Sequence, residues 1–331
     1  MKQDLISRAA ALIMSKNRFL IATHVNPDGD AIGSSLALGE ILRTMGKDVV
    51  CYCETPVSDR YLFMPGAYQF TAELADPEQR EVFIVIDCSD LDRAGKVLKK
   101  SRMPEAMINI DHHRNNHISG GVHLVDENAC ASAELVYRLI GELRQPITRS
   151  AALNLYTAIL TDTGSFRFSN TNQAAFRISE EMVGLGVIPQ VVARKVYGTY
   201  SAARLKLLSH VLDTLEISPN KMFATLTVKL ATMAKTGTIR DDINGFVDYP
   251  RFITGIEFSA LVQEVSEGRF HVSLRSAGNV NVAKIAEEFG GGGHFNASGF
   301  ETAGDIDSIK SRLTRIADSV EPQGSGVGGM K

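Results

Sequence analysis

The first half of the chain alternates short apolar runs with segments in which apolar residues recur every three to four positions. Runs of the first kind are typical of buried strands, and the longer spacing is typical of amphipathic helices. The predicted strands are 19–25, 48–54, 82–86 and 106–110, and the predicted helices are 31–45, 131–143 and 150–161. This alternation predicts an α/β domain with a mostly parallel sheet flanked by helices.

The second half has a different order of elements. Three strand-like runs come first, and Glu267-Gly268 marks a hairpin between the last two. A helix then runs into four consecutive glycines, and one more helix follows. The strand-like runs are 223–228, 256–265 and 269–275, and the helices are 282–289 and 305–320. We expect a smaller, mixed α/β domain in this half.

The segment that separates the two halves is helical in pattern and polar, with Pro189 near its start. We therefore expect a first domain at 1–188, a helical linker at 189–214, a second domain at 215–321 and a disordered, Gly/Ser-rich tail at 322–331. A hinge in the linker would allow the two domains to close over a ligand.

Composition argues against several classes of protein. The 331 residues carry a net charge of −3, so no chain-wide basic field favours long duplex nucleic acid as a partner. The four cysteines form neither a disulfide framework nor a zinc-binding pair, which is typical of a reducing compartment. The N-terminus lacks the apolar core of a signal peptide, and no window approaches the ~20 apolar residues of a membrane span. We expect a cytoplasmic protein without a membrane partner.

Acidic residues and histidines gather where the predicted strands of the first half end. The first group is His24-Val25-Asn26-Pro27-Asp28-Gly29-Asp30, and Asp87 and Asp111 each follow an apolar run directly. Because open α/β sheets bind ligands at the carboxyl ends of their strands, we expect these side chains to lie together. Asp162 differs, since it ends a predicted helix that Gly164 then breaks.

These residue types suit a pair of divalent cations. Two such ions about 3.5–4 Å apart can activate a water and clamp the oxygens of a phosphate, and they need several carboxylates, usually including one that bridges. The residues that supply this set are His24, Asp28, Asp30, Asp87, His112 and Asp162. The mixture of imidazole and carboxylate favours Mn²⁺, with Mg²⁺ or Co²⁺ as alternatives. Each aspartate taken alone could instead cap a helix, as Asp30 is placed to do, but the pattern recurs at successive strand ends.

Taken in order, these groups resemble the motifs of the DHH family of phosphoesterases. The segment from His24 to Ser34 resembles the first motif, Val85-Ile86-Asp87 the second, Asp111-His112-His113 the third and Thr161-Asp162-Thr163-Gly164 the fourth. Ser273-Leu274-Arg275-Ser276 and the run from Gly290 to Gly299 resemble the DHHA1 domain. The resemblance covers nearly the whole chain. With no added domains, it is nearest to the compact, NrnA-like subgroup of oligoribonucleases and phosphatases of 3′-phosphoadenosine-5′-phosphate (PAP).

The resemblance implies a role for each residue of the first domain. His24 and Asp28 would bind one metal ion, Asp30, His112 and Asp162 the other, and Asp87 would bridge both, with a bridging water as nucleophile. His113 would face the scissile phosphate, and Asp111 would orient His112 from behind. The expected catalytic residues are therefore His113, Asp111 and Asp87.

The glycine run and one arginine are the expected substrate-binding residues of the second domain. Successive glycines can present their N–H groups to an anion, although a merely flexible loop is the competing interpretation. Arg275 ends a strand-like run and offers a planar fork that suits a terminal phosphate. The predicted set is Arg275, Gly291, Gly292, Gly293 and His294.

The expected substrate is short RNA or a nucleotide. The resemblance implies hydrolysis of short oligoribonucleotides (nanoRNA) and linear dinucleotides to mononucleotides, and removal of the 3′-phosphate of PAP. A phosphodiesterase of cyclic dinucleotides such as c-di-AMP or c-di-GMP would use the same residues, and the sequence does not separate the two. An inorganic pyrophosphatase fits the glycine-rich motif less well, and a non-catalytic nucleotide-binding regulator would not need a bridging carboxylate. The apolar helices of the first domain could also support a homodimer.

Overall fold

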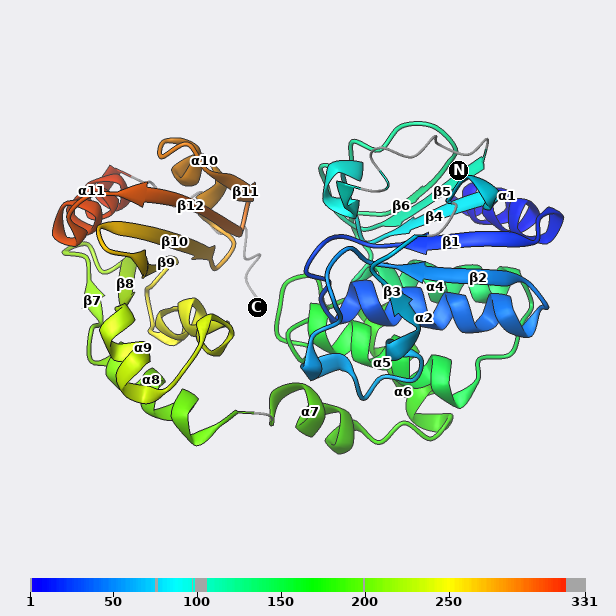
Figure 1. Cartoon of the computed structure of the whole chain (residues 1–331), viewed down its shortest axis with the longest axis horizontal. Helices are drawn as coiled ribbons and strands as arrows, with labels where there is room; N and C mark the ends of the chain where they lie inside the picture. The colour runs from blue at the N-terminus through cyan, green and yellow to red at the C-terminus, as the bar shows by residue number, and fades with distance from the viewer. Residues whose placement is uncertain (1, 75–76, 97, 99–105, 199, 320–331) are drawn as a thin grey trace, which may run out of the picture. The chain divides into compact units, whose positions relative to one another are not determined.

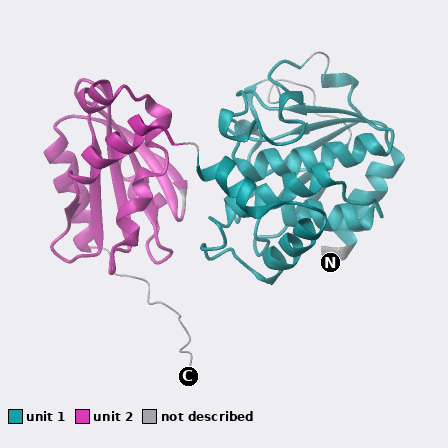
Figure 2. Cartoon of the chain, turned by 90° about the horizontal axis from the view of Figure 1, so that it is seen from below, with its two compact units in different colours: residues 1–199 teal, residues 200–331 magenta. Residues whose placement is uncertain are grey.

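The computed structural model describes residues 2–74, 77–96, 98, 106–198 and 200–319. The chain divides into two compact units, residues 1–199 and 200–331 (Figure 2). The predicted linker 189–214 is shared between them: helix α7 (Pro189–Tyr197) lies in the first unit and helix α8 (Ala202–Leu212) in the second. The predicted tail 322–331 lies outside the described residues.

The N-terminal unit is built on a six-stranded parallel sheet in the order β3-β2-β1-β4-β5-β6 (Figure 1). Its strands are β1 (Arg18–Ala22), β2 (Asp48–Tyr52), β3 (Phe70–Thr71), β4 (Val82–Ile86), β5 (Ala106–Asp111) and β6 (Val122–Val125). The parallel sheet predicted from the apolar runs is confirmed. The run Val82–Ile86 is buried at every position, as expected for a central strand covered on both faces.

Helices α1 (Lys2–Ser15), α2 (Gly29–Thr44) and α4 (Ser132–Glu142) cover one face of this sheet. Helices α5 (Arg149–Asp162) and α6 (Gln173–Gly184) pack outside them, α5 against α2 and α4, and α6 against α5 and α4. Alternate strand residues, such as Ile84 and Ile86, join the helices in one apolar core, while Phe83 and Val85 point to a second core on the opposite face. Short 3-10 turns connect the elements at Asp59–Tyr61, Ala67–Gln69, Pro77–Gln79 and Leu91–Ala94.

Helices α2 and α5 pack unusually closely. A Cβ atom built on Gly33 would lie 2.4 Å from the backbone oxygen of Asn154, and one built on Gly29 would lie 2.3 Å from Oγ1 of Thr161. No side chain larger than hydrogen fits at either glycine without movement of the neighbouring helix. The first turn of α2 therefore lies directly against the last turn of α5.

The C-terminal unit holds a mixed sheet in the order β11-β12-β10-β9-β8-β7, in which only β8 and β9 pair in parallel among the described strands. Its strands are β7 (Glu216–Ile217), β8 (Phe223–Val228), β9 (Phe258–Ser266), β10 (Arg269–Ser276), β11 (Gly292–His294) and β12 (Ala297–Ala303). Its helices, besides α8, are α9 (Leu230–Thr236), α10 (Val282–Glu287) and α11 (Ile306–Ser319), with 3-10 segments η5 (Arg240–Ile243) and η6 (Phe246–Phe252). The predicted mixed α/β domain is confirmed, including the hairpin at Glu267-Gly268.

Within the described residues, no helix is both long and apolar enough to cross a lipid bilayer.

Candidate metal centre

The candidate site lies where the order of the strands reverses. Counted from the middle of the sheet, β1 leads outward to β2 and β3, whereas β4 leads outward to β5 and β6. Ligands of open α/β sheets bind outside the carboxyl ends of the strands at such a switch point. His24 and Asp28 follow β1, Asp87 follows β4, and His112 follows β5. The topology thus brings residues that are far apart in sequence to one place.

Asp28 combines two tasks at the start of α2. Its Oδ1 atom accepts hydrogen bonds of 3.0 Å from the backbone N–H groups of Asp30 and Ala31, so Asp28 is the N-cap of the helix. The sequence had suggested Asp30 as a cap, but Asp30 instead lies inside the helix and is buried. Capping uses only Oδ1 of Asp28, and its second oxygen remains available to a cation.

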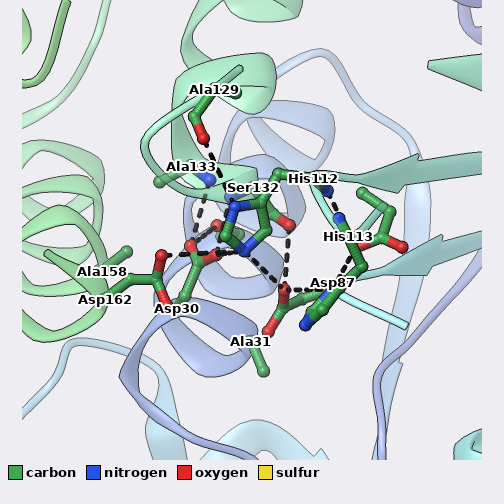
Figure 3. Close-up of polar contacts among 12 residues, drawn as sticks. Asp30, Ala31, Asp87, His112, His113, Ala129, Ser132, Ala133, Ala158 and Asp162 are labelled. Carbon is green, nitrogen blue, oxygen red and sulfur yellow. Dashed lines mark hydrogen bonds and ion pairs between the residues drawn. The ribbon is translucent and has the colours of Figure 1, made fainter. Parts of the chain in front are cut away.

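The six predicted ligands fall into two groups, in each of which the ligand atoms lie within 4.8 Å of one another. One group is His24, Asp28 and Asp87, and the other is Asp30, His112 and Asp162; Figure 3 shows the second group together with Asp87. Asp87 faces both groups: its Oδ2 lies 3.5 Å from Nε2 of His24, and its Oδ1 lies 3.6 Å from Nε2 of His112. Asp162 reaches the same His112 nitrogen at 3.6 Å. A carboxylate placed in this way can bridge two cations.

The two imidazoles are oriented as metal ligands usually are. Nδ1 of His24 lies 2.9 Å from the carbonyl oxygen of Val25, and Nδ1 of His112 lies 3.4 Å from that of Ala129. A backbone carbonyl on Nδ1 holds the proton there and turns Nε2 toward the centre. The donors of both groups, imidazole nitrogen and carboxylate oxygen, therefore fit divalent transition ions such as Mn²⁺.

The charged groups of the centre shift one another's pKa values. Burial alone would lower the pKa of His24, but the contact with Asp87 and the charge of Asp28 raise it to about 9. His112 behaves in the same way, because the carboxylates around it outweigh burial and raise its pKa to about 9. Burial, together with the charge of Asp87, raises the pKa of Asp30 to about 7. Several carboxylates so close together repel one another. Protons or metal ions can supply the positive charge that compensates this repulsion.

The N-terminus of α4 supports the centre from one side. The backbone N–H of Ser132 donates to Oδ2 of Asp30 at 2.6 Å, and that of Ala133 donates to Oδ1 at 3.0 Å (Figure 3). The hydroxyl of Ser132 donates to Oδ1 of Asp87 at 3.1 Å, and that of Ser34 donates to Asp30 at 2.9 Å. Ser132 is not among the predicted site residues, because its sequence context favours a simple helix start over a place in the site.

Comparison with known proteins identifies the family. Residues 18–159 match the N-terminal domain of the DHH family, and residues 223–320 match the DHHA1 domain. The chain belongs to the DHH family. It is 33% identical over 296 residues, or 88% of this chain and 87% of the relative, to the bifunctional oligoribonuclease and PAP phosphatase NrnA of Thermus thermophilus. It is 28% identical to the protein of the same name from Bacillus subtilis, over 85% of this chain and 88% of the relative.

A solved structure agrees with this assignment. The crystal structure of an exopolyphosphatase-related protein from Bacteroides fragilis superposes with a TM-score of 0.88 at 30% identity, covering 96% of each chain. The resemblance to NrnA-like members of the DHH family is thereby confirmed, and the protein is a phosphoesterase, a hydrolase of phosphate esters. Phosphoesterases of the DHH family are metal-dependent, in keeping with the two groups of ligands.

The histidine pair that gives the DHH family its name is held differently from our expectation. Oδ1 of Asp111 accepts a hydrogen bond of 2.6 Å from Nδ1 of His113, and it contacts only the backbone N–H of His112, at 2.8 Å. Asp111 therefore orients the ring of His113, not that of His112 as predicted. Asn116 donates to the other oxygen of Asp111 at 2.6 Å and fixes the carboxylate.

Asn170 is a second residue that the sequence did not reveal. Its amide nitrogen donates to Oδ2 of Asp162 at 2.8 Å and to the carbonyl oxygen of Cys130 at 2.8 Å. These two bonds tie the end of α5, which carries the candidate ligand Asp162, to the chain just before α4. The side chain lies eight residues beyond Asp162, past an irregular turn, so no periodicity points to it.

In the DHHA1 unit, most of the predicted substrate-binding residues lie on strands of the mixed sheet. Arg275 is on β10, opposite Ala297 of β12, and Gly292, Gly293 and His294 form β11. The second half of the glycine run is thus a strand paired with β12, and Gly290 and Gly291 precede it. Gly291 and Gly293 are explained by packing, since a Cβ atom on either would lie within 2.6 Å of β12, whereas a Cβ atom on Gly292 would meet open space.

Proposed function

We propose that this protein hydrolyses short oligoribonucleotides and linear dinucleotides to mononucleotides, and removes the 3′-phosphate of PAP. The observation that carries the proposal is the pair of ligand groups with Asp87 facing both, in contact with His24 on one side and His112 on the other. Relatives over nearly the full length of the chain are named as bifunctional oligoribonucleases and PAP phosphatases, which supports this choice of substrates.

The residues of the centre would divide the work as follows. His24, Asp28 and Asp87 would hold one cation, Asp30, His112, Asp162 and Asp87 the other, and Mn²⁺ suits these donors best. Bound there, the cations would activate a water for attack on phosphorus and neutralise charge on the phosphate oxygens. His113, fixed through Nδ1 by Asp111, would contact the scissile phosphate through Nε2. The Ser132 hydroxyl and the first N–H groups of α4 would keep Asp87 and Asp30 in place.

The DHHA1 unit would select the substrate. Arg275, Gly291, Gly292, Gly293 and His294 are the residues that we propose for this task. These residues would bind a phosphate of the substrate that is not hydrolysed.

The test is Mn²⁺-dependent hydrolysis of a matched panel that contains a 5′-phosphorylated diribonucleotide, a longer RNA, PAP, cyclic di-AMP, cyclic di-GMP and pyrophosphate. We expect turnover of the dinucleotide and PAP, and slow turnover of the cyclic compounds. Preference for a cyclic dinucleotide would overturn the proposed substrate. Asp87→Asn should abolish hydrolysis, while the matched control Asp126→Asn, which changes an aspartate that directly follows strand β6 but belongs to neither ligand group, should retain it.

A further inference from the structure

Two arginines lie on neighbouring elements of the C-terminal unit. Ser259 of β9 lies directly opposite Arg275 of β10. The Ser259 hydroxyl donates a 2.6 Å hydrogen bond to the carbonyl oxygen of Val247, which fixes the 3-10 segment η6 next to that pair. Asp248 and Arg251 belong to η6, and the charges of both act on Arg275. The register of the sheet thus explains why η6, which carries an arginine 24 positions earlier in the chain, packs near the strand of Arg275.

The donors of the two guanidinium groups are only partly used. Arg251 donates from Nη1 to Oδ1 of Asp248 at 2.9 Å, and its Nε atom is buried without a hydrogen-bond partner in the described part of the chain. The hydrogen bond described for the Arg275 guanidinium runs to the carbonyl oxygen of the adjacent Leu274, at 2.9 Å. A buried N–H of a charged group without an acceptor is costly, and an anionic ligand would supply the acceptor.

The charge balance points in the same direction. Two guanidinium groups face one carboxylate, that of Asp248, so the cluster carries a net charge of one positive unit. Burial lowers the pKa of Arg275, and Arg251 lowers it further while Asp248 opposes this effect. Asp248 accepts a hydrogen bond from Arg251 and restrains the orientation of that side chain. A positioned pair of guanidinium groups is the arrangement that proteins use to bind phosphate with several parallel hydrogen bonds.

We propose that Arg251 and Arg275 together form one site for a phosphomonoester dianion, the terminal phosphate of the substrate that is not hydrolysed. The inference rests on the proposed function and names a residue, Arg251, and a substrate feature that it would recognise. A phosphomonoester carries about −1.5 to −2 charges at pH 7 and three terminal oxygens, whereas a phosphodiester carries one charge and two such oxygens. A second guanidinium can pair with the extra charge and donate hydrogen bonds to the extra oxygen of the monoester. Substrates that lack a terminal monoester, including cyclic dinucleotides, would lose this contact.

The test compares two substrates that differ only in this phosphate, 5′-phosphorylated diadenylate and unphosphorylated diadenylate, each with wild-type protein and with Arg251→Gln. We expect Arg251→Gln to lower kcat/KM for the phosphorylated dinucleotide by roughly 10- to 100-fold, mainly through KM, as for a lost hydrogen bond to a charged group. For the unphosphorylated dinucleotide the change should stay below about twofold, within ordinary mutational scatter. Arg269→Gln, which removes an exposed arginine at the start of the same strand, is the matched control and should change neither.

The outcomes separate the inference from the function on which it rests. If wild-type protein hydrolyses neither dinucleotide nor PAP, the proposed function fails. If it hydrolyses them and Arg251→Gln damages both dinucleotides equally, the phosphomonoester site is wrong. Should Arg251→Gln fail to fold by circular dichroism, Arg275→Gln takes its place in the same comparison. A loss confined to the phosphorylated substrate supports the site, and an equal loss on both overturns it.

Discussion

The hydroxyl of Ser132 offers the sharpest test of how the centre is supported. Ser132→Ala removes one hydrogen bond, the 3.1 Å contact to Oδ1 of Asp87, and keeps the backbone N–H that donates to Asp30. Both Ser132 and Asp87 are buried, so water does not replace the lost donor easily. The substitution therefore perturbs the orientation of the shared carboxylate and leaves the cap of α4 intact.

The size of the effect follows from the charge on the acceptor. A hydrogen bond to an ionised group contributes about 1.5–3 kcal/mol. Because 1.4 kcal/mol corresponds to a tenfold change in an equilibrium constant, we expect metal affinity to fall by roughly 10- to 100-fold, the range also found for groups that orient metal ligands. Contacts of Asp87 with His24 and His112 remain in the variant, which favours the lower end of the range.

The assay is a Mn²⁺ titration of phosphoester hydrolysis, with unfolding monitored in parallel. Ser132→Ala should move the midpoint of the titration to higher Mn²⁺, and saturating Mn²⁺ should largely restore kcat. The matched control is Ser35→Ala, which removes a buried hydroxyl of α2 that has no hydrogen-bond partner among the described residues. An unchanged midpoint in Ser132→Ala, or a loss of kcat that Mn²⁺ does not restore, would refute the reasoning.

Four further predictions rest on the same geometry. Asn170→Ala removes the 2.8 Å bond to Asp162, so Mn²⁺ affinity in the same titration should fall by roughly tenfold, whereas an unchanged affinity would show that this bond does not position the ligand. Folding raises the pKa of His24 and of His112 from 6.5 to about 9, so both imidazoles of the metal-free protein are protonated at pH 7.5. Metal binding should therefore release about two protons from these histidines. Calorimetry in buffers of different ionisation enthalpy measures this release. Since the folded-state pKa values are the higher ones, the same protons stabilise the metal-free fold fully below pH 6.5, and chemical denaturation should show that contribution lost as the pH rises through about 9. Gly33→Ala places a Cβ atom 2.4 Å from a backbone oxygen of α5. The substitution should lower the free energy of unfolding by about 1–3 kcal/mol or more, measured by denaturant titration. A variant as stable as wild type would contradict the close packing.

The sequence predicted best those helices and strands whose buried faces impose a regular spacing of apolar residues. Strand β4 agrees with the predicted range 82–86 at both ends, because a strand buried on both faces needs an unbroken apolar run. Helices α1 and α6 and the short strand β6 were not predicted. Strand β12 was also missed, because its sequence, Ala-Ser-Gly-Phe-Glu-Thr-Ala, lacks the branched apolar residues of a typical strand.

The site could be predicted in part for a similar reason. Strand ends are visible in the sequence, so the acidic residues that follow them could be grouped before their distances were known. The supports of the ligands could not be predicted, because they are backbone N–H groups and single hydroxyls or amides that come from other elements. The backbone amide of Ser132 donates to Asp30, which lies 102 residues earlier in the chain. No local sequence pattern predicts a hydrogen bond over that separation. Whether Asp111 bonds the ring of His112 or that of His113 depends on the side-chain torsions of the two histidines. The sequence does not determine these torsions.

The close contact of α2 and α5 also determines how the centre responds to change. Gly33 brings a hydrogen atom, not a side chain, against the backbone oxygen of Asn154, and Gly29 does the same against the side chain of Thr161. Asp30 at the start of α2 and Asp162 at the end of α5 are therefore spaced in part by backbone atoms, which have no alternative rotamers. A larger residue at either glycine would push the two helices apart and move these two carboxylates with them. The packing of the helices and the geometry of the centre thus depend on each other.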